Sequence, residues 1–205
     1  WVDTDQSLGK AALQAAKHRP SPILCVSARA KPSALDRQRG RVGPVADEVL
    51  LGATCPVLLI GPETALSRGL PLTEIIVGLD GSPASEAMLP VAAAWARSMK
   101  LRLVVAGVVS PKRSDDHQRE EHYLQRQTAS VQASAPEARY ELVVASEPAA
   151  GLVELAAARE DAVVAMSTHG RKGSAKAPLG AAAHRVLSRC PRALLVQRPP
   201  DLVVD

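Results

Sequence analysis

Aromatic side chains are nearly absent from this 205-residue sequence: tryptophan, tyrosine and phenylalanine together make up 2% of it, and phenylalanine does not occur. Since 46% of the residues are still hydrophobic, alanine, valine, leucine and isoleucine must build the core. No apolar run approaches the length of a membrane-spanning helix. The formal net charge is +4, but the basic residues are scattered and lack interleaved aromatics. We therefore expect neither a nucleic acid nor a membrane as a partner.

Cysteine is scarce as well. Cys25, Cys55 and Cys190 lie too far apart in sequence for a C-x-x-C site, and their odd number argues against a disulfide framework. This usage is typical of a protein of the reducing cytoplasm, in which all three would be small buried hydrophobic residues.

Several catalytic motifs are missing from the sequence. It contains no G-x4-G-K-[S/T] phosphate loop, no G-x-S-x-G nucleophile turn and no histidine–cysteine spacing typical of a metal site. The S-G-G-x-D-S loop of ATP pyrophosphatases is also missing. His169 has no identifiable serine or cysteine partner with an orienting acid, so we assign no catalytic residue.

Apolar runs alternate with helix-forming stretches through most of the chain. Helices are expected between these runs, and Ser82-Pro83 is typical of a helix start. The charged stretch Pro111–Glu121 is expected to be a loop. Five alternations predict an α/β fold with a doubly wound parallel sheet. The five runs that predict its strands are residues 73–79, 101–109, 140–145, 162–166 and 193–196.

The first 62 residues repeat part of this pattern. Val49-Leu50 matches Val186-Leu187 at an offset of 137 (186 − 49), and Gly43 matches Gly180 at the same offset (180 − 43). Residues 23–27 match residues 163–167 at an offset of 140 (163 − 23). A repeat of this length indicates duplicated domains. The expected organisation is the carboxyl half of a first domain (1–62), a linker (63–71) and a complete second domain (72–199).

The first repeat begins midway through a unit. At the offset of 140, Trp1 corresponds to Glu141 (141 − 1), so the first two strands and helices of the unit would be missing. The remaining strands could not bury both faces unaided. We expect either a fragment of a tandem protein or completion by another chain. A plain amino-terminal arm packed on the second domain is the alternative.

One loop carries a nucleotide-binding signature. Ser167-x2-Gly170-x9-Gly180-Ala181 resembles the G-x2-G-x9-G-[S/T] motif of the universal stress protein family, and Ile75–Pro83 resembles the family's first strand and turn. Two positions depart from the motif, because Ser167 replaces glycine and Ala181 replaces serine or threonine. The resemblance implies a Rossmann-like fold of the adenine nucleotide alpha hydrolase type, with five parallel strands in the order 3-2-1-4-5.

The resemblance also implies a site for ATP or a related adenine nucleotide, with or without Mg²⁺. The backbone of Val108 would read the adenine edge, and amides at the start of the last helix would hold the terminal phosphates. Loop cations would add positive charge; they are Arg171, Lys172 and Lys176. The full set of implied binding residues is Gly78, Leu79, Asp80, Val108, Met166, Ser167, Gly170, Gly180, Ala181, Ala182 and Ala183.

Some of these roles have alternatives. Ala181 lacks the hydroxyl that would donate to a phosphate, which forfeits roughly 0.5–1.5 kcal/mol of binding. Ser167 either crowds the ribose or forms a hydrogen bond with it. Asp80 contacts the nucleotide, caps the following helix, or does both. In the first repeat Gly43 precedes Pro44 and the loop has lost its second glycine, so we expect no nucleotide there.

The function that the resemblance implies is an adenine-nucleotide sensor in the stress response. The alternative is a scaffold of the same family that has lost nucleotide binding, and slow ATP hydrolysis ranks last. Members of the family often pair their last strands between domains or between chains. Val57–Ile60 and Leu194–Val196 are therefore the expected edges, in a homodimer or within this chain.

Overall fold

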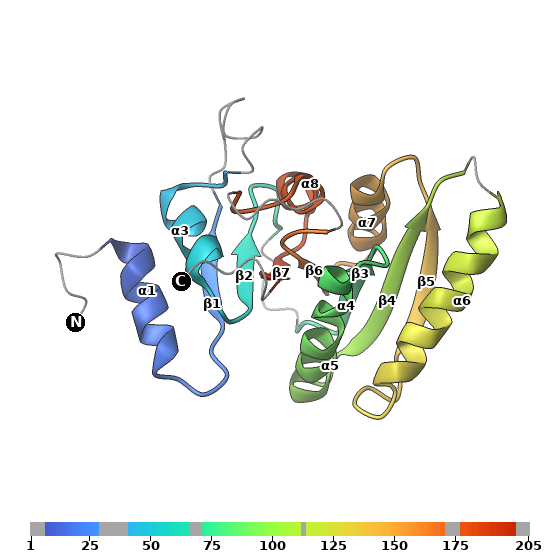
Figure 1. The fold of residues 1–205 in the computed structure, drawn as a ribbon, viewed down its shortest axis with the longest axis horizontal. Helices are drawn as coiled ribbons and strands as arrows, with labels where there is room; N and C mark the ends of the chain where they lie inside the picture. Colours follow the sequence, from blue (N-terminus) through green and yellow to red (C-terminus); the bar gives the residue numbers. More distant parts are fainter. Residues whose placement is uncertain (1–6, 29–40, 66–70, 112–113, 171–176, 200–205) are drawn as a thin grey trace.

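The structure, a computed structural model, describes residues 7–28, 41–65, 71–111, 114–170 and 177–199 (Figure 1). Helices and strands alternate along most of this length. In chain order the elements are α1 (Leu8–Lys17), β1 (Leu24–Ser27), α3 (Pro44–Gly52), β2 (Val57–Ile60), β3 (Glu74–Leu79), α4 (Pro83–Glu86), α5 (Met88–Met99), β4 (Arg102–Val109), α6 (Ser114–Val131), β5 (Arg139–Val144), α7 (Pro148–Ala157), β6 (Ala162–Ser167), α8 (Ala181–Arg189) and β7 (Leu194–Gln197).

All the strands join one sheet, in the order β1-β2-β7-β6-β3-β4-β5. The last five strands of the chain follow the expected order 3-2-1-4-5 and are parallel. The sheet is nevertheless larger than the expected five-stranded parallel sheet, because β1 and β2 extend it to seven strands. The sheet is mixed, since β2 runs antiparallel to β7.

Helices cover the sheet on both faces (Figure 1). Every residue of β3 and β6 is buried, as expected for central strands of a parallel sheet. Alternate side chains enter two cores: Ile75 and Val77 pack with α5 and α6, whereas Ile76 packs on the side of α3, α7 and α8. None of the described helices is long and apolar enough to cross a membrane.

The two parts of the chain meet where β2 pairs with β7. Leu58 lies opposite Leu195, with Val57 opposite Val196 and Leu59 opposite Leu194. Since 58 + 137 = 195, the central pair joins equivalent positions of the sequence repeat, and the pairing is symmetrical about it. The sequence predicts these two strand edges, to be paired in a homodimer or within one chain. In the structure they pair within the chain.

Element boundaries follow the offsets of the sequence repeat. Helix α3 and strand β2 shift by 137 residues onto α8 and β7 (181 − 44 and 194 − 57). Helix α1 shifts by 140 residues onto α7 (148 − 8). We call α1 to Gly61 the first repeat and α7 to Arg198 the second repeat.

Two local expectations are wrong, and one expected helix is divided in two. The stretch Pro111–Glu121 is not a loop, because α6 begins at Ser114; glutamate, glutamine and arginine favour helix, and the fully buried Leu124 anchors it. The helix after Ser82 is divided at Ala87 into α4 and α5, although Ser82 does cap it. Cys25 is exposed rather than buried, because it lies on the edge strand β1.

An ion network joins the amino ends of the strands around Glu74, whose side chain is 2% exposed. Arg159 Nε lies 2.6 Å from Glu74 Oε2, and Arg139 Nη2 lies 3.0 Å from Oε1. Arg159 also pairs with Glu141 on β5. The network links β3, β5 and the segment after α7 at the edge of the sheet opposite to the carboxyl ends of β3 and β6.

Candidate functional site

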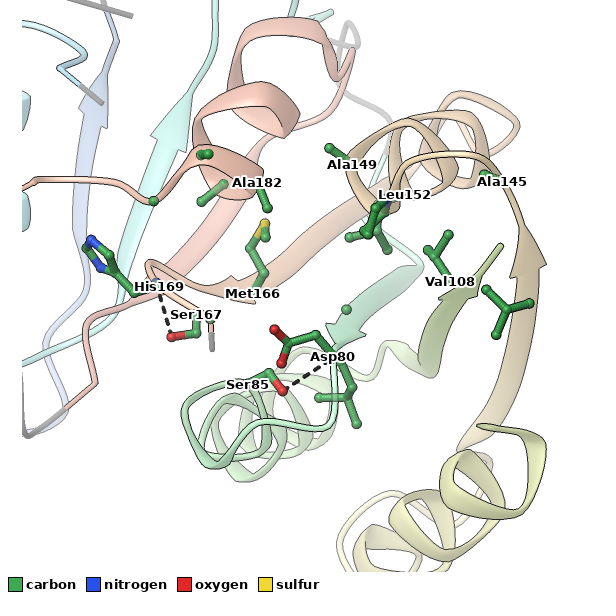
Figure 2. A pocket seen from close by; sticks show the side chains of 18 of the residues that line it. Asp80, Ser85, Val108, Ala145, Ala149, Leu152, Met166, Ser167, His169 and Ala182 are labelled. Carbon is green, nitrogen blue, oxygen red and sulfur yellow. Dashed lines mark hydrogen bonds between the residues drawn. The ribbon is translucent and has the colours of Figure 1, made fainter. Parts of the chain in front are cut away.

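A cavity of about 770 Å³ opens at the carboxyl ends of β3, β4 and β6 (Figure 2). In parallel α/β sheets this edge is where ligands bind. The structure brings all the residues implied by the resemblance to this one cavity: Gly78, Leu79, Asp80, Val108, Met166, Ser167, Gly170, Gly180, Ala181, Ala182 and Ala183. The loop cations Arg171, Lys172 and Lys176 lie outside the described residues.

The turn after β3 holds the Asp80 carboxylate. Asp80 Oδ1 accepts a hydrogen bond from the Ser82 amide at 3.0 Å, and the Asp80 amide donates to Ser85 Oγ at 3.2 Å. The helix cap is Ser82, whose hydroxyl accepts from the Ser85 amide. Of the two roles considered for Asp80, capping therefore belongs to Ser82, and Asp80 organises the turn beside the cavity.

Gly170 passes very close to this carboxylate. A Cβ atom on Gly170 would overlap Asp80 Oδ2, so a larger residue here must displace the carboxylate or the backbone. Gly180 is also confined, because a Cβ there would lie 3.1 Å from the Thr168 carbonyl oxygen. The two glycines of the signature therefore permit close packing of the loop around the cavity.

The amino terminus of α8 faces the cavity without a side-chain cap. Its N-cap, Gly180, makes no capping hydrogen bond, and the first turn contains no acidic residue. Ala181, Ala182 and Ala183 follow and line the cavity. Amides at a helix start carry partial positive charge, so this end of the cavity suits an anion.

Ser167 ends β6 with a buried side chain. Its Oγ accepts a hydrogen bond from the His169 amide at 3.4 Å, drawn as a dashed line in Figure 2. The hydroxyl that replaces the hydrogen of the family's glycine is thus engaged with the protein's own backbone.

His169 is 2% exposed and sits behind the turn. Its Nδ1 lies 3.0 Å from Thr168 Oγ1, and Figure 2 shows its ring pointing away from Asp80. Burial, together with the nearby Arg198 guanidinium, lowers the pKa of His169 below its ordinary value. His169 is therefore neutral at pH 7, and its Nε2 has no hydrogen-bond partner among the described residues.

Several cavity residues had no signal in the sequence motif. Arg119 and Glu120 reach the cavity from α6, whose charged first part the sequence analysis predicts to be a loop. Others come from the end of β4 and the residue after it, from the turns after β5 and β6, and from α7: Val109, Ser110, Ala145, Ser146, Pro148, Ala149, Leu152, Thr168 and His169. Ser85, on α4, completes the lining. For these residues the sequence offers one signal, a helix start that follows a strand, as at Pro148, because such starts lie at the carboxyl edge of the sheet.

The described residues contain no group of three or more histidine, cysteine, aspartate or glutamate side chains that could hold a metal ion. What the site offers is a deep apolar wall, the Asp80 carboxylate and an uncapped helix start. This combination suits a ligand with an apolar ring system and an anionic group.

Comparisons with known proteins point to one family. The Universal stress protein family model matches residues 72–198, more than half of the chain. A universal stress protein of Mycobacterium tuberculosis is 28% identical over 170 residues, which cover 78% of this chain and 57% of that protein. A Mycobacterium bovis universal stress protein aligns with the same values. The chain thus spans about 57% of the length of the curated relatives it matches.

Solved structures show the same fold. A universal stress protein from Archaeoglobus fulgidus has a TM-score of 0.63 and 16% identity, covering 92% of this chain and 64% of that one. A universal stress protein solved in complex with cAMP has a TM-score of 0.52 and 23% identity, covering 62% and 97% of the two chains. An Archaeoglobus fulgidus structure in complex with dAMP has a TM-score of 0.51 and 19% identity, covering 62% and 98%.

Proposed function

The chain belongs to the universal stress protein family, and on that premise we propose that it binds an adenine nucleotide, ATP or a close relative, as a sensor module. The observation that carries this proposal is the open cavity of about 770 Å³ beside Asp80, with the uncapped start of α8 on its wall. A cavity filled by the protein's own side chains would have left only a scaffold.

The lining supports a definite orientation of the ligand. Phosphates would lie at Gly180–Ala183, where backbone amides and the helix dipole favour negative charge. The ribose would lie near Asp80, whose carboxylate can accept hydrogen bonds from hydroxyl groups. Adenine would rest against Val108 and Leu152 on the apolar side. The complexes of two related structures with cAMP and dAMP support an adenine nucleotide as the class of ligand.

We also propose that the first repeat is the carboxyl half of a second, equivalent domain. The coinciding boundaries of α1 with α7 and of α3 with α8 support this proposal. So does the symmetrical pairing of β2 with β7. Because each of these strands has a neighbour on both sides, a homodimer would have to use other surfaces than these edges.

A negative charge introduced at the start of α8 tests nucleotide binding. Ala182→Asp places a carboxylate on the cavity wall, where it favours the helix but repels phosphate. We expect ATP affinity to fall by about 2 kcal/mol, about thirtyfold, by isothermal titration calorimetry. Ala182→Asn is the control, because it has nearly the same shape without the charge, and it should keep most of the affinity.

The rival function is a family scaffold that no longer binds nucleotide. Ala181, which lacks the phosphate-donating hydroxyl, is the observation that favours it. If the unmodified protein gives no calorimetric signal with ATP, cAMP or dAMP and releases no adenine nucleotide on acid extraction, the scaffold is the correct function.

A further inference from the structure

Arg198 lies just beyond β7 and is 3% exposed, which is unusual for an arginine. Its Nη1 donates a hydrogen bond to the carbonyl oxygen of Ala177 at 3.2 Å. Burying a guanidinium costs free energy unless its N–H groups find hydrogen-bond acceptors. The hydrogen bonds of Arg198 therefore indicate what this residue does in the fold.

The bond from Arg198 acts on the turn that leads into α8. Three residues beyond Ala177, the Gly180 amide donates to the Thr168 carbonyl at 2.8 Å. Thr168 is fixed in turn, because its amide donates to the Gln197 carbonyl at 3.0 Å. Arg198 and Gln197 are adjacent, so the end of β7 holds both sides of the β6–α8 connection.

His169 fills the space between these two sides. A Cβ on Gly180 would lie 3.4 Å from His169 Cδ2, so the ring packs directly under the start of α8. Arg198 is close enough to His169 to disfavour its protonated form. The neutral ring thus lies beneath the start of α8, within electrostatic reach of the buried guanidinium.

The first repeat has no counterpart of this arginine. At the offset of 137, Arg198 corresponds to Gly61 (198 − 137). A side chain there is excluded, because a Cβ on Gly61 would overlap the Leu187 carbonyl oxygen. The buried arginine is therefore a feature of the second repeat, which supplies the part of the cavity lining from Pro148 to Ala183.

We propose that Arg198 is a positioning residue for the phosphate end of the cavity. By holding the Ala177 carbonyl, it sets the turn Ala177–Gly180 and thereby aims the first amides of α8 at the cavity. Arg198 does not line the cavity and reaches this turn through its hydrogen bond to the Ala177 carbonyl. This inference rests on the proposed function where it concerns nucleotide affinity, but its effect on the turn requires no ligand.

The test compares Arg198→Met with Arg192→Met. Arg192 is a matched control, because it is also buried and donates to backbone carbonyls, those of Arg159 and Pro191, at the other end of β7. In the protein without nucleotide, hydrogen exchange of the Gly180 amide should accelerate about tenfold or more in Arg198→Met and stay unchanged in Arg192→Met. Arg198→Lys, which keeps the charge but not the planar fork, should restore part of the protection.

ATP affinity supplies the second readout. It should fall about tenfold in Arg198→Met, recover in part in Arg198→Lys and remain unchanged in Arg192→Met. Unchanged Gly180 exchange in a folded Arg198→Met protein would overturn the proposal, as would equal acceleration in both methionine variants. If the unmodified protein binds no ATP, the proposed function fails, and the exchange result alone decides the role of Arg198.

Discussion

Helices α3 and α8 are equivalent in the two repeats, yet their amino termini differ in one decisive respect. At the start of α3, Asp47 Oδ1 accepts the Val42 amide at 2.7 Å, and Arg41 Nε donates to Asp47 Oδ2 at 3.0 Å. Pro44 removes one of the helix-start amides altogether. The positive end of α3 is therefore occupied by the protein's own carboxylate.

The start of α8 carries no such carboxylate. The position equivalent to Asp47 is His184 (47 + 137), and the position equivalent to Pro44 is Ala181, which retains its amide. The two glycine N-caps also serve different needs: Gly43 has a φ of 134°, which other residues rarely adopt, whereas Gly180 has an ordinary φ of −70°. Two helices with corresponding positions thus differ at their amino termini. We call the start of α3, which Asp47 occupies, closed, and the start of α8, which has no acidic residue, open.

Breaking the junction between the repeats should have the largest effect. Leu59 and Leu194 face each other across β2 and β7 and are fully buried. Leu59→Ala or Leu194→Ala should lower the free energy of unfolding by about 2–5 kcal/mol, measured by urea denaturation. Leu58→Ala, at a half-buried position of the same strand, should have a smaller effect. If the repeats were independent units, Leu59→Ala would produce two transitions instead of one lowered transition.

Removing the carboxylate of α3 tests the closed helix start. Asp47→Ala leaves the buried Val42 amide without its acceptor, so the free energy of unfolding should fall by about 1–2 kcal/mol. Asp47→Asn keeps an oxygen acceptor, so its free energy of unfolding should fall by less. Neither variant should change ATP affinity, and a large change in calorimetry would contradict the separation of the two helix starts.

Restoring the family's hydroxyl should strengthen nucleotide binding at the start of α8. Ala181→Ser adds a donor at the cavity wall, and ATP affinity should rise by roughly 0.5–1.5 kcal/mol, up to about tenfold. The equivalent change in the first repeat, Pro44→Ser, should add no ATP binding, because Asp47 still occupies that helix end. An affinity unchanged by Ala181→Ser would show that phosphates do not reach α8.

The smallest expected effect concerns pH. Because the folded pKa of His169 is lowered, the unfolded chain binds a proton more readily than the folded chain. The stability associated with neutral His169 is fully present above its ordinary pKa of 6.5 and is lost as pH falls from there through the lowered folded pKa. His169→Gln should flatten this part of the curve of melting temperature against pH. An unaltered curve would mean that other groups cause the acid sensitivity.

The sequence predicts residues 72–199 well and the contacts between elements poorly. Strand order is what the family resemblance implies, and the convergence of Asp80, Gly170 and Gly180 on one edge follows from the same resemblance together with the geometry of parallel sheets. The start of α6 was missed because a charged amphipathic helix and a charged loop share a composition, and only the burial of Leu124 separates them. Arg198 and Arg119 carry no motif, since their roles depend on neighbours distant in sequence.

The ion network of Glu74 has a consequence for substitutions at the candidate site. Arg159 and Arg139 clamp the sheet at its amino edge, on the side remote from Asp80 and Gly180. The ion pairs that hold the strands together and the candidate site therefore lie at opposite rims of the same strands. Substitutions at the candidate site, such as Ser167→Gly or Ala181→Ser, would leave these ion pairs untouched.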